Sequence, residues 1–74
     1  MESHHPEDSV SIECAVYEVL DAYGLAHIRA VDGSTYGLNR DTPGVKFADL
    51  REGQRVFVEV TRKFGRVLHA QLLE

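Results

Sequence analysis

Apolar and polar residues alternate along most of the chain beyond residue 10, which is the period-2 pattern of strands that bury one face. Five segments carry this pattern: residues 11–20, 25–31, 35–38, 54–62 and 67–73. The side chains that we expect to point inward are Ile12, Cys14, Val16, Ala26, Ile28, Ala30, Tyr36, Leu38, Val56, Val58, Val60, Leu68, Ala70 and Leu72. Most of these residues are β-branched or small, so we predict five short strands around a narrow core.

The connections between these segments indicate how the strands pair. Asp32-Gly33 stands between two alternating runs, which is the strongest short signal for a β-hairpin. The longest irregular stretch, residues 39–53, contains Pro43-Gly44 and a possible helical turn in FADLRE, residues 47–52. Five strands that are mostly linked by hairpins, with one long connection after the third, predict an all-β fold. The expected architecture is a small, partly open antiparallel barrel of the OB or SH3-like kind.

The chain is expected to contain one folded domain, residues 11–74, after a flexible N-terminal tail, residues 1–10. The tail is polar and includes Pro6. It also holds His4 and His5, but no cysteine or carboxylate stands at ligand spacing around them. We therefore predict no metal site and no cofactor.

The charge is unevenly distributed. The net charge is −4, yet all eight basic residues fall between Arg29 and Arg66, where five acidic residues leave an excess of +3. This excess is smaller than the basic footprint of a strong phosphate binder. Because Cys14 is the single cysteine, the chain cannot form an internal disulfide, which suits a reducing cytoplasm. The position of Cys14 in the alternation predicts that it is a small buried residue. Neither a signal peptide nor a run of about 18 apolar residues is present, so we expect a cytoplasmic protein without membrane contact.

Several motifs resemble those of the cold-shock domain family, whose members are five-stranded OB-folds that bind single-stranded RNA and DNA. GLAHI, residues 24–28, aligns with the first RNA-binding motif of that family, Gly-Phe-Gly-Phe-Ile. DGSTYGLN, residues 32–39, aligns with its Asp-Gly turn and its second motif, Val-Phe-Val-His. The best match is LREGQRVFVEV, residues 50–60, and HAQLL, residues 69–73, resembles the closing strand. The resemblance spans about residues 14–73 and implies an OB-type barrel.

The same resemblance implies a binding face on which the family places six aromatic residues and one histidine. The corresponding positions of this chain hold Glu18, Leu25, His27, Gly37, Asn39, Arg40 and Phe47. Phe47 keeps the aromatic of the family, and His27 keeps a ring that can stack. Each stacked base contributes roughly 1–3 kcal/mol, so losing three platforms lowers affinity by about 10² to 10⁶-fold. The resemblance therefore predicts weak binding through a divergent face.

The candidate contact residues are two rings, one amide and five cations. They are His27, Phe47, Arg29, Arg40, Asn39, Arg62, Lys63 and Arg66. Each has an ordinary structural alternative: an exposed strand histidine, a phenylalanine that caps the open barrel end, or charges at a solvated turn tip. No nucleophile–base pair, phosphate loop or metal spacing is found, so we do not expect an enzyme.

Two functions follow from these observations. The first is a small monomeric module that binds single-stranded RNA or DNA weakly. The second is a protein–protein interaction module that keeps the barrel and has lost nucleic-acid binding, which Glu18, Leu25 and Gly37 on the expected binding face favour.

Overall fold

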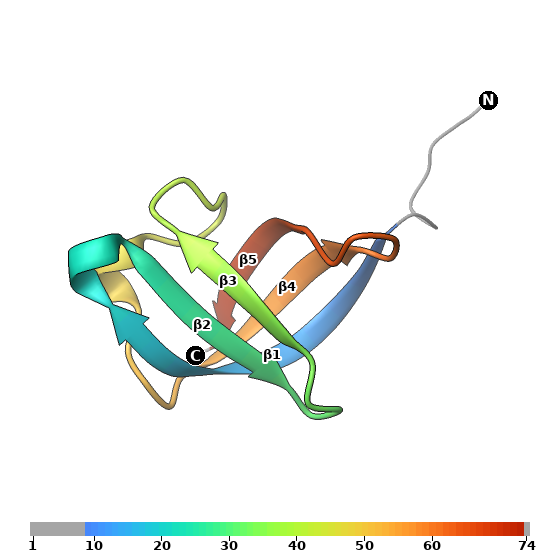
Figure 1. Ribbon diagram of the computed structural model, residues 1–74, viewed down its shortest axis with the longest axis horizontal. Helices are drawn as coiled ribbons and strands as arrows, with labels where there is room; N and C mark the ends of the chain where they lie inside the picture. Colours follow the sequence, from blue (N-terminus) through green and yellow to red (C-terminus); the bar gives the residue numbers. More distant parts are fainter. Residues whose placement is uncertain (1–8, 74) are drawn as a thin grey trace.

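The computed structural model describes residues 9–73, which form a single antiparallel sheet (Figure 1). Its five strands are β1 (Ser9–Leu20), β2 (Leu25–Ala30), β3 (Thr35–Asn39), β4 (Arg55–Thr61) and β5 (Val67–Leu73). The order across the sheet is β3-β2-β1-β4-β5, which places β1 in the centre. The predicted all-β, five-stranded antiparallel fold is confirmed.

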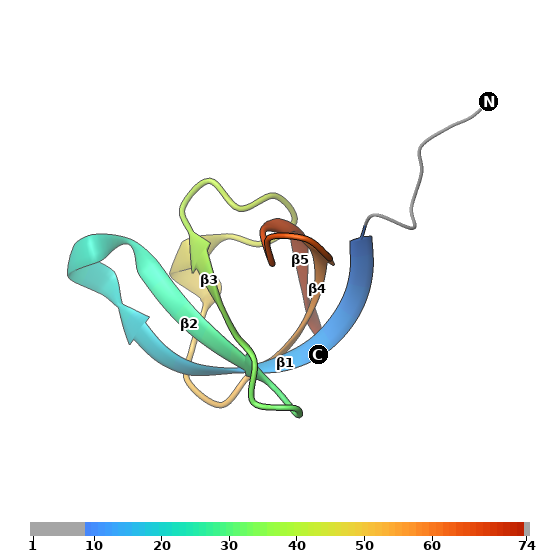
Figure 2. The ribbon, with the colours of Figure 1, turned by 45° about the vertical axis from the view of Figure 1, so that its right-hand side comes forward.

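The sheet curls strongly because β1 serves both halves of it. The N-terminal part of β1 pairs with β4, its C-terminal part pairs with β2, and Cys14 and Ala15 pair with both neighbours. Figure 2 shows the resulting half-barrel, with β2 and β3 on one side and β4 and β5 on the other. Some Cα atoms of β3 and β5 approach within 8 Å, but these two strands are not hydrogen-bonded neighbours. The half-barrel is therefore open along the seam between β3 and β5.

The core lies on the concave face of the sheet, as the alternation predicts. Its buried apolar side chains are Cys14, Val16, Ala26, Ile28, Ala30, Leu38, Leu50, Val56, Val58, Val60 and Ala70. The prediction is wrong for Leu68, which is 42% exposed. In the register of β4 with β5, Glu59 faces His69 and Val60 faces Val67, so Leu68 is an extra residue. This bulge turns Leu68 outward and leaves Val67 packed against the core.

The turns follow their sequence signals. After β2, Gly33 donates its backbone N–H to the carbonyl oxygen of Ala30, and the side chain of Asp32 accepts the backbone N–H of Ser34 at 2.9 Å. That hydrogen bond from Ser34 lowers the pKa of Asp32. The predicted helical turn is present as a 3₁₀ turn, η3 (Phe47–Asp49), and another, η2 (Asp21–Tyr23), joins β1 to β2.

The folded part begins earlier than expected. Ser9 and Val10, which fall in the predicted tail, belong to β1 and pair with Thr61 and Val60 of β4. The remainder of that tail, with His4 and His5, lies outside the described residues. Among residues 9–73, no helix is long and apolar enough to cross a membrane.

Candidate functional site

A bulge in β1 shapes the outer face of the sheet. Val16 pairs with Ile28 and Glu18 pairs with His27, so Tyr17 is an extra residue between the two pairs. A bulge sets two residues of one strand against one residue of its partner and re-aims their side chains. Here it brings Tyr17 and Glu18 to the same outward-facing histidine, His27.

These side chains contact one another closely. The Tyr17 and His27 rings are stacked, with centroids 5.9 Å apart and an interplanar angle of 23°. The Arg29 guanidinium carbon lies 4.5 Å from the centroid of the Tyr17 ring, in a cation–π contact. Nδ1 of His27 is 2.8 Å from a carboxylate oxygen of Glu18. We call Tyr17, His27 and Arg29 the Tyr17 platform.

The platform is accessible but ordered. Tyr17 is 39% exposed, and the side chain of His27 is 33% exposed, less than expected for an outward-facing residue in the middle of a strand. The stacking on Tyr17 and the contact with Glu18 account for this difference. Two rings held in fixed positions lose little conformational freedom when a planar ligand stacks on them.

Beside the platform, the outer face becomes flat. Gly37 of β3 pairs with His27, faces outward and has no side chain to cover the neighbouring surface. Beyond Gly37, at the open seam between β3 and β5, lies a hollow of about 450 Å³ that Asn39, Arg66 and Leu68 help to line. The platform, Gly37 and Arg66 therefore follow one another across the strands.

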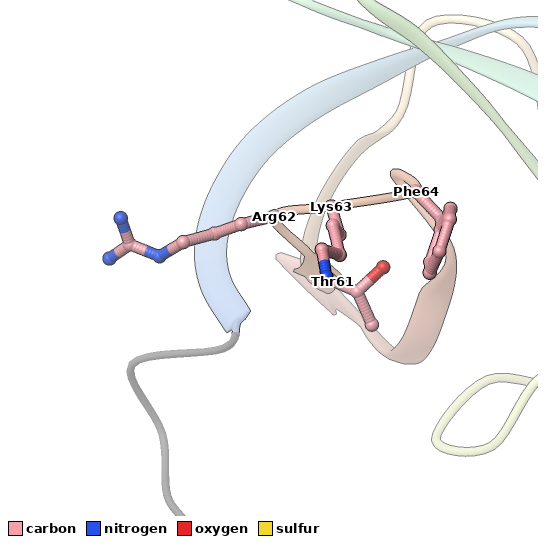
Figure 3. Close-up of a pocket in the computed structure, with 4 residues that line it drawn as sticks. All are labelled: Thr61, Arg62, Lys63 and Phe64. Atoms are coloured by element: carbon pink, nitrogen blue, oxygen red, sulfur yellow. The ribbon is translucent and has the colours of Figure 1, made fainter.

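The β4–β5 hairpin holds the other basic residues. Arg62, Lys63 and Phe64 line a hollow of about 540 Å³, and Figure 3 shows the side chains of Arg62 and Phe64 on opposite sides of the hairpin. Phe64 is 83% exposed. Within residues 9–73, the side chains of Arg62, Lys63 and Arg66 form no ion pair and no hydrogen bond. Their charges are available to a ligand.

Two predicted contact residues lie together at another place. The Arg40 guanidinium carbon is 5.3 Å from the centroid of the Phe47 ring, and Arg40 donates a hydrogen bond to the backbone oxygen of Asp21 at 3.1 Å. Phe47 is half-buried against the core. This geometry favours the alternative in which Phe47 caps the end of the barrel, and it leaves Arg40 holding η2 in place.

Asn39 also has a local structural contact. Its side-chain oxygen accepts the backbone N–H of Asp41 at 2.8 Å and the hydroxyl of Thr42 at 3.3 Å, while Thr42 accepts the backbone N–H of Asn39. These bonds shape the exit from β3. The side-chain nitrogen of Asn39, Nδ2, donates no hydrogen bond within the described residues and can donate to a ligand.

Of the eight predicted residues, the structure brings His27 and Arg29 together and places Asn39 and Arg66 along the same hollow. Tyr17 and Arg55 are not among the contact residues predicted from the sequence. The alternation shows that both face outward, but only the bulge explains why Tyr17 reaches His27. Within residues 9–73, no three His, Cys, Asp or Glu side chains are grouped as metal ligands would be.

The predicted burial of Cys14 is confirmed, since this residue is 3% exposed and its thiol is free. Burial raises the pKa of the Cys14 thiol, and the carboxylates of Asp32 and Glu13 raise it further. The pKa shift therefore opposes formation of the reactive thiolate.

In comparisons with known proteins, no protein-family model, no curated protein and no solved structure matches this chain.

Proposed function

We propose that this protein is a non-enzymatic, monomeric, cytoplasmic module of the OB type that binds single-stranded RNA or DNA weakly. The Tyr17 platform takes a base, the flat surface over Gly37 accommodates the next one, and Arg66 pairs with a phosphate. Arg62 and Lys63 add positive charge at the same end of the sheet. The motifs shared with cold-shock domains support this proposal, although the rings occupy different positions.

The observation that carries the proposal is the stack of Tyr17 on His27 next to a glycine that leaves the sheet bare. Proteins that bind single strands without strict sequence preference combine aromatic side chains on the surface with a basic path for the backbone. Here Tyr17 of β1 and His27 of β2 supply the rings, next to Gly37 of β3, in the strand order that Figure 1 shows, and Arg66 supplies a cation at the hollow beyond β3. The bulge at Tyr17 supplies a ring that the family motifs do not.

The affinity expected from these groups is low. Two stacked bases contribute roughly 2–6 kcal/mol in total, and exposed ion pairs add about 0–1 kcal/mol each. With three ion pairs the sum is at most about 9 kcal/mol, and association costs at least about 4 kcal/mol of it, so the expected dissociation constants are roughly millimolar.

A titration with short oligonucleotides tests the proposal. Amide chemical shifts of the ¹⁵N-labelled protein are followed at low salt while a single strand of about six nucleotides, DNA or RNA, is added. We expect shifts at Tyr17, His27, Gly37 and Arg66, and Tyr17→Ala should weaken binding by about 5- to 100-fold. Tyr23→Ala is the matched control, because Tyr23 is 78% exposed and lies in η2, away from the platform. An absence of shifts at these four residues at millimolar oligonucleotide would exclude the proposal.

A second function, protein binding, is favoured by the apolar side chains around the seam. Leu68 is exposed at the hollow beside Arg66, Phe64 is exposed on the neighbouring β4–β5 hairpin, and β3 and β5 are the edges of the sheet. An extended segment of a partner can add to such an edge. Capture of partners from a nuclease-treated lysate separates the two functions: partners that persist without nucleic acid favour protein binding, and partners that disappear favour the first proposal.

A further inference from the structure

Two arginines stand opposite the same small residue on the outer face. Ala15 of β1 pairs with Arg29 of β2 on one side and with Arg55 of β4 on the other. Paired residues in antiparallel strands have Cα atoms about 4.5–5.5 Å apart. The side chains of both arginines therefore leave the backbone on either side of the exposed Ala15, one strand away from it. Between them lies a hollow of about 360 Å³, which Tyr17 and Val31 also line.

Both arginines have free donors. Arg29 lies with its guanidinium over the Tyr17 ring and donates no hydrogen bond within residues 9–73, so its N–H groups remain available in the plane of the group. Arg55 donates a single hydrogen bond, from Nη1 to Glu13 at 3.1 Å, and its side chain is 69% exposed. The remaining N–H groups of Arg55 can pair with an anion.

We propose that the hollow between Arg29 and Arg55 is a phosphate site, which holds the backbone of the strand whose base stacks on the Tyr17 platform. This inference rests on the proposed function and extends its path onto β4. A phosphate fits because guanidinium groups bind its oxygens in pairs and because a nucleotide presents a planar base next to its phosphate. Tyr17 borders both the hollow and His27, so the two parts of one nucleotide meet at this residue.

The site also fixes the direction in which the ligand crosses the sheet. Arg55 lies on β4, Ala15 on β1, His27 on β2 and Gly37 on β3, which are consecutive strands of the sheet, and His27 is two residues along β2 from the partner of Ala15. Strands are about 4.8 Å apart, so this path is about 14 Å long before it reaches Arg66 at the seam. A strand of nucleic acid would therefore run across the strands with a cation at each end of the path.

Glu13 is the carboxylate that lines this hollow, where its charge opposes a phosphate, and the carboxylate of Asp32 acts on Cys14 of the same hollow. Glu13 pairs with Arg55, and 46% of the Glu13 side chain is exposed. An exposed ion pair contributes only about 0–1 kcal/mol, so a phosphate can replace the carboxylate as the partner of Arg55. Removal of the Glu13 charge should consequently strengthen binding, an effect that loss of folding cannot imitate.

The test measures the dissociation constant of the same oligonucleotide of about six nucleotides at several salt concentrations. Arg55→Gln should weaken binding by about 3- to 10-fold and make the slope of log K against log salt less negative by about 0.7, the value for one phosphate on a single strand. Glu13→Gln should strengthen binding by up to about 5-fold. Lys46→Gln and Glu52→Gln are the controls for charge, because both residues are exposed in the connection before β4. Neither control should alter the affinity by more than about 2-fold.

The outcomes separate this inference from the function on which it rests. If the oligonucleotide binds and Tyr17→Ala weakens it, but Arg55→Gln and Glu13→Gln leave the affinity and the salt slope unchanged, the phosphate site is refuted and the proposed function stands. If the parent protein binds no oligonucleotide, both are refuted. Should Arg55→Gln fail to fold by circular dichroism, the gain expected for Glu13→Gln decides the question alone.

Discussion

Substitutions at Gly37 should have opposite effects on two properties: a side chain there should stabilise the fold, and a large one should weaken oligonucleotide binding. Gly37 lies in the middle of β3, on the outer face, opposite His27. A Cβ atom added there would meet only the side chain of Leu25, at 3.4 Å, which is an ordinary van der Waals contact. The backbone of Gly37 also lacks the positive φ that excludes other residues. The fold therefore does not require glycine at this position.

The magnitudes follow from this environment. Glycine within a strand costs roughly 0.5–1 kcal/mol relative to alanine, so Gly37→Ala should raise the unfolding free energy by that amount. For a domain of this size, the midpoint of thermal unfolding should rise by about 2–8 °C. Gly37→Val places a branched side chain where a base would lie, and losing one stacked base should weaken oligonucleotide binding by about 5- to 100-fold.

Thermal unfolding by circular dichroism and the oligonucleotide titration, performed on the same samples, measure both effects. Gly33→Ala is the control: Gly33 has φ +92 in the β2–β3 turn, so the variant should lose about 1–2 kcal/mol of stability and keep its affinity. If Gly37→Val folds and binds as tightly as the parent protein, no ligand crosses β3 and the proposed path is wrong. If Gly37→Ala is destabilised, the assignment of Gly37 to an open surface is wrong.

Three further predictions concern the fold. Gly44→Ala should lower the unfolding free energy measured in urea by more than about 2 kcal/mol, because Gly44 has φ +95 and the added Cβ atom would collide with the backbone oxygen of Ala70. A loss of unfolding free energy smaller than that of Gly33→Ala would contradict this prediction. Ile28→Ala should cost about 2–5 kcal/mol, since Ile28 is 0% exposed, and a cooperative thermal transition near that of the parent would argue against the register of β2. The pKa of the Cys14 thiol is raised in the folded protein above 9.0, its ordinary value in the unfolded chain. The stability that the neutral thiol contributes is therefore complete below pH 9.0 and is lost as the pH rises through the pKa of the folded state. The difference in unfolding free energy between the parent and Cys14→Ala should therefore narrow above pH 9.0, and a constant difference would show that the thiol titrates normally.

Much of the fold could be predicted from the alternation of residues, because burial of one face imposes a period of two on a strand. Ile28, Leu38 and Val58 were assigned to the core on this basis, and all three are buried. This reasoning fails at a bulge, because one extra residue changes the face of the sheet to which the side chains beside it point, and no sequence signal indicates the bulge. Leu68 was therefore assigned to the wrong face.

The candidate site was harder to predict for the same reason. His27 could be selected from its place in the family motif and Arg29 from its charge, and they do lie together on the Tyr17 platform. Tyr17 itself became visible only through the bulge that sets it beside His27. The proximity of Arg29 to Arg55 depends on the register of β1 with two different strands. Nothing in the sequence around either arginine indicates that both pair with Ala15.

The distribution of charge on the sheet explains why binding should depend on rings more than on electrostatic attraction. The outer faces of the five described strands hold three glutamates, Glu13, Glu18 and Glu59, against Arg29 and Arg55, so the face carries no positive excess. Arg62, Lys63 and Arg66 lie at its margin, on the β4–β5 hairpin. In the proposed function, positive charge at the margin attracts a strand and orients it, whereas its residence on the face would depend mainly on stacking at Tyr17 and on the flat surface over Gly37. A strongly basic face would hold any polyanion at low salt, whereas we expect the proposed site to prefer single strands, whose bases are free to stack.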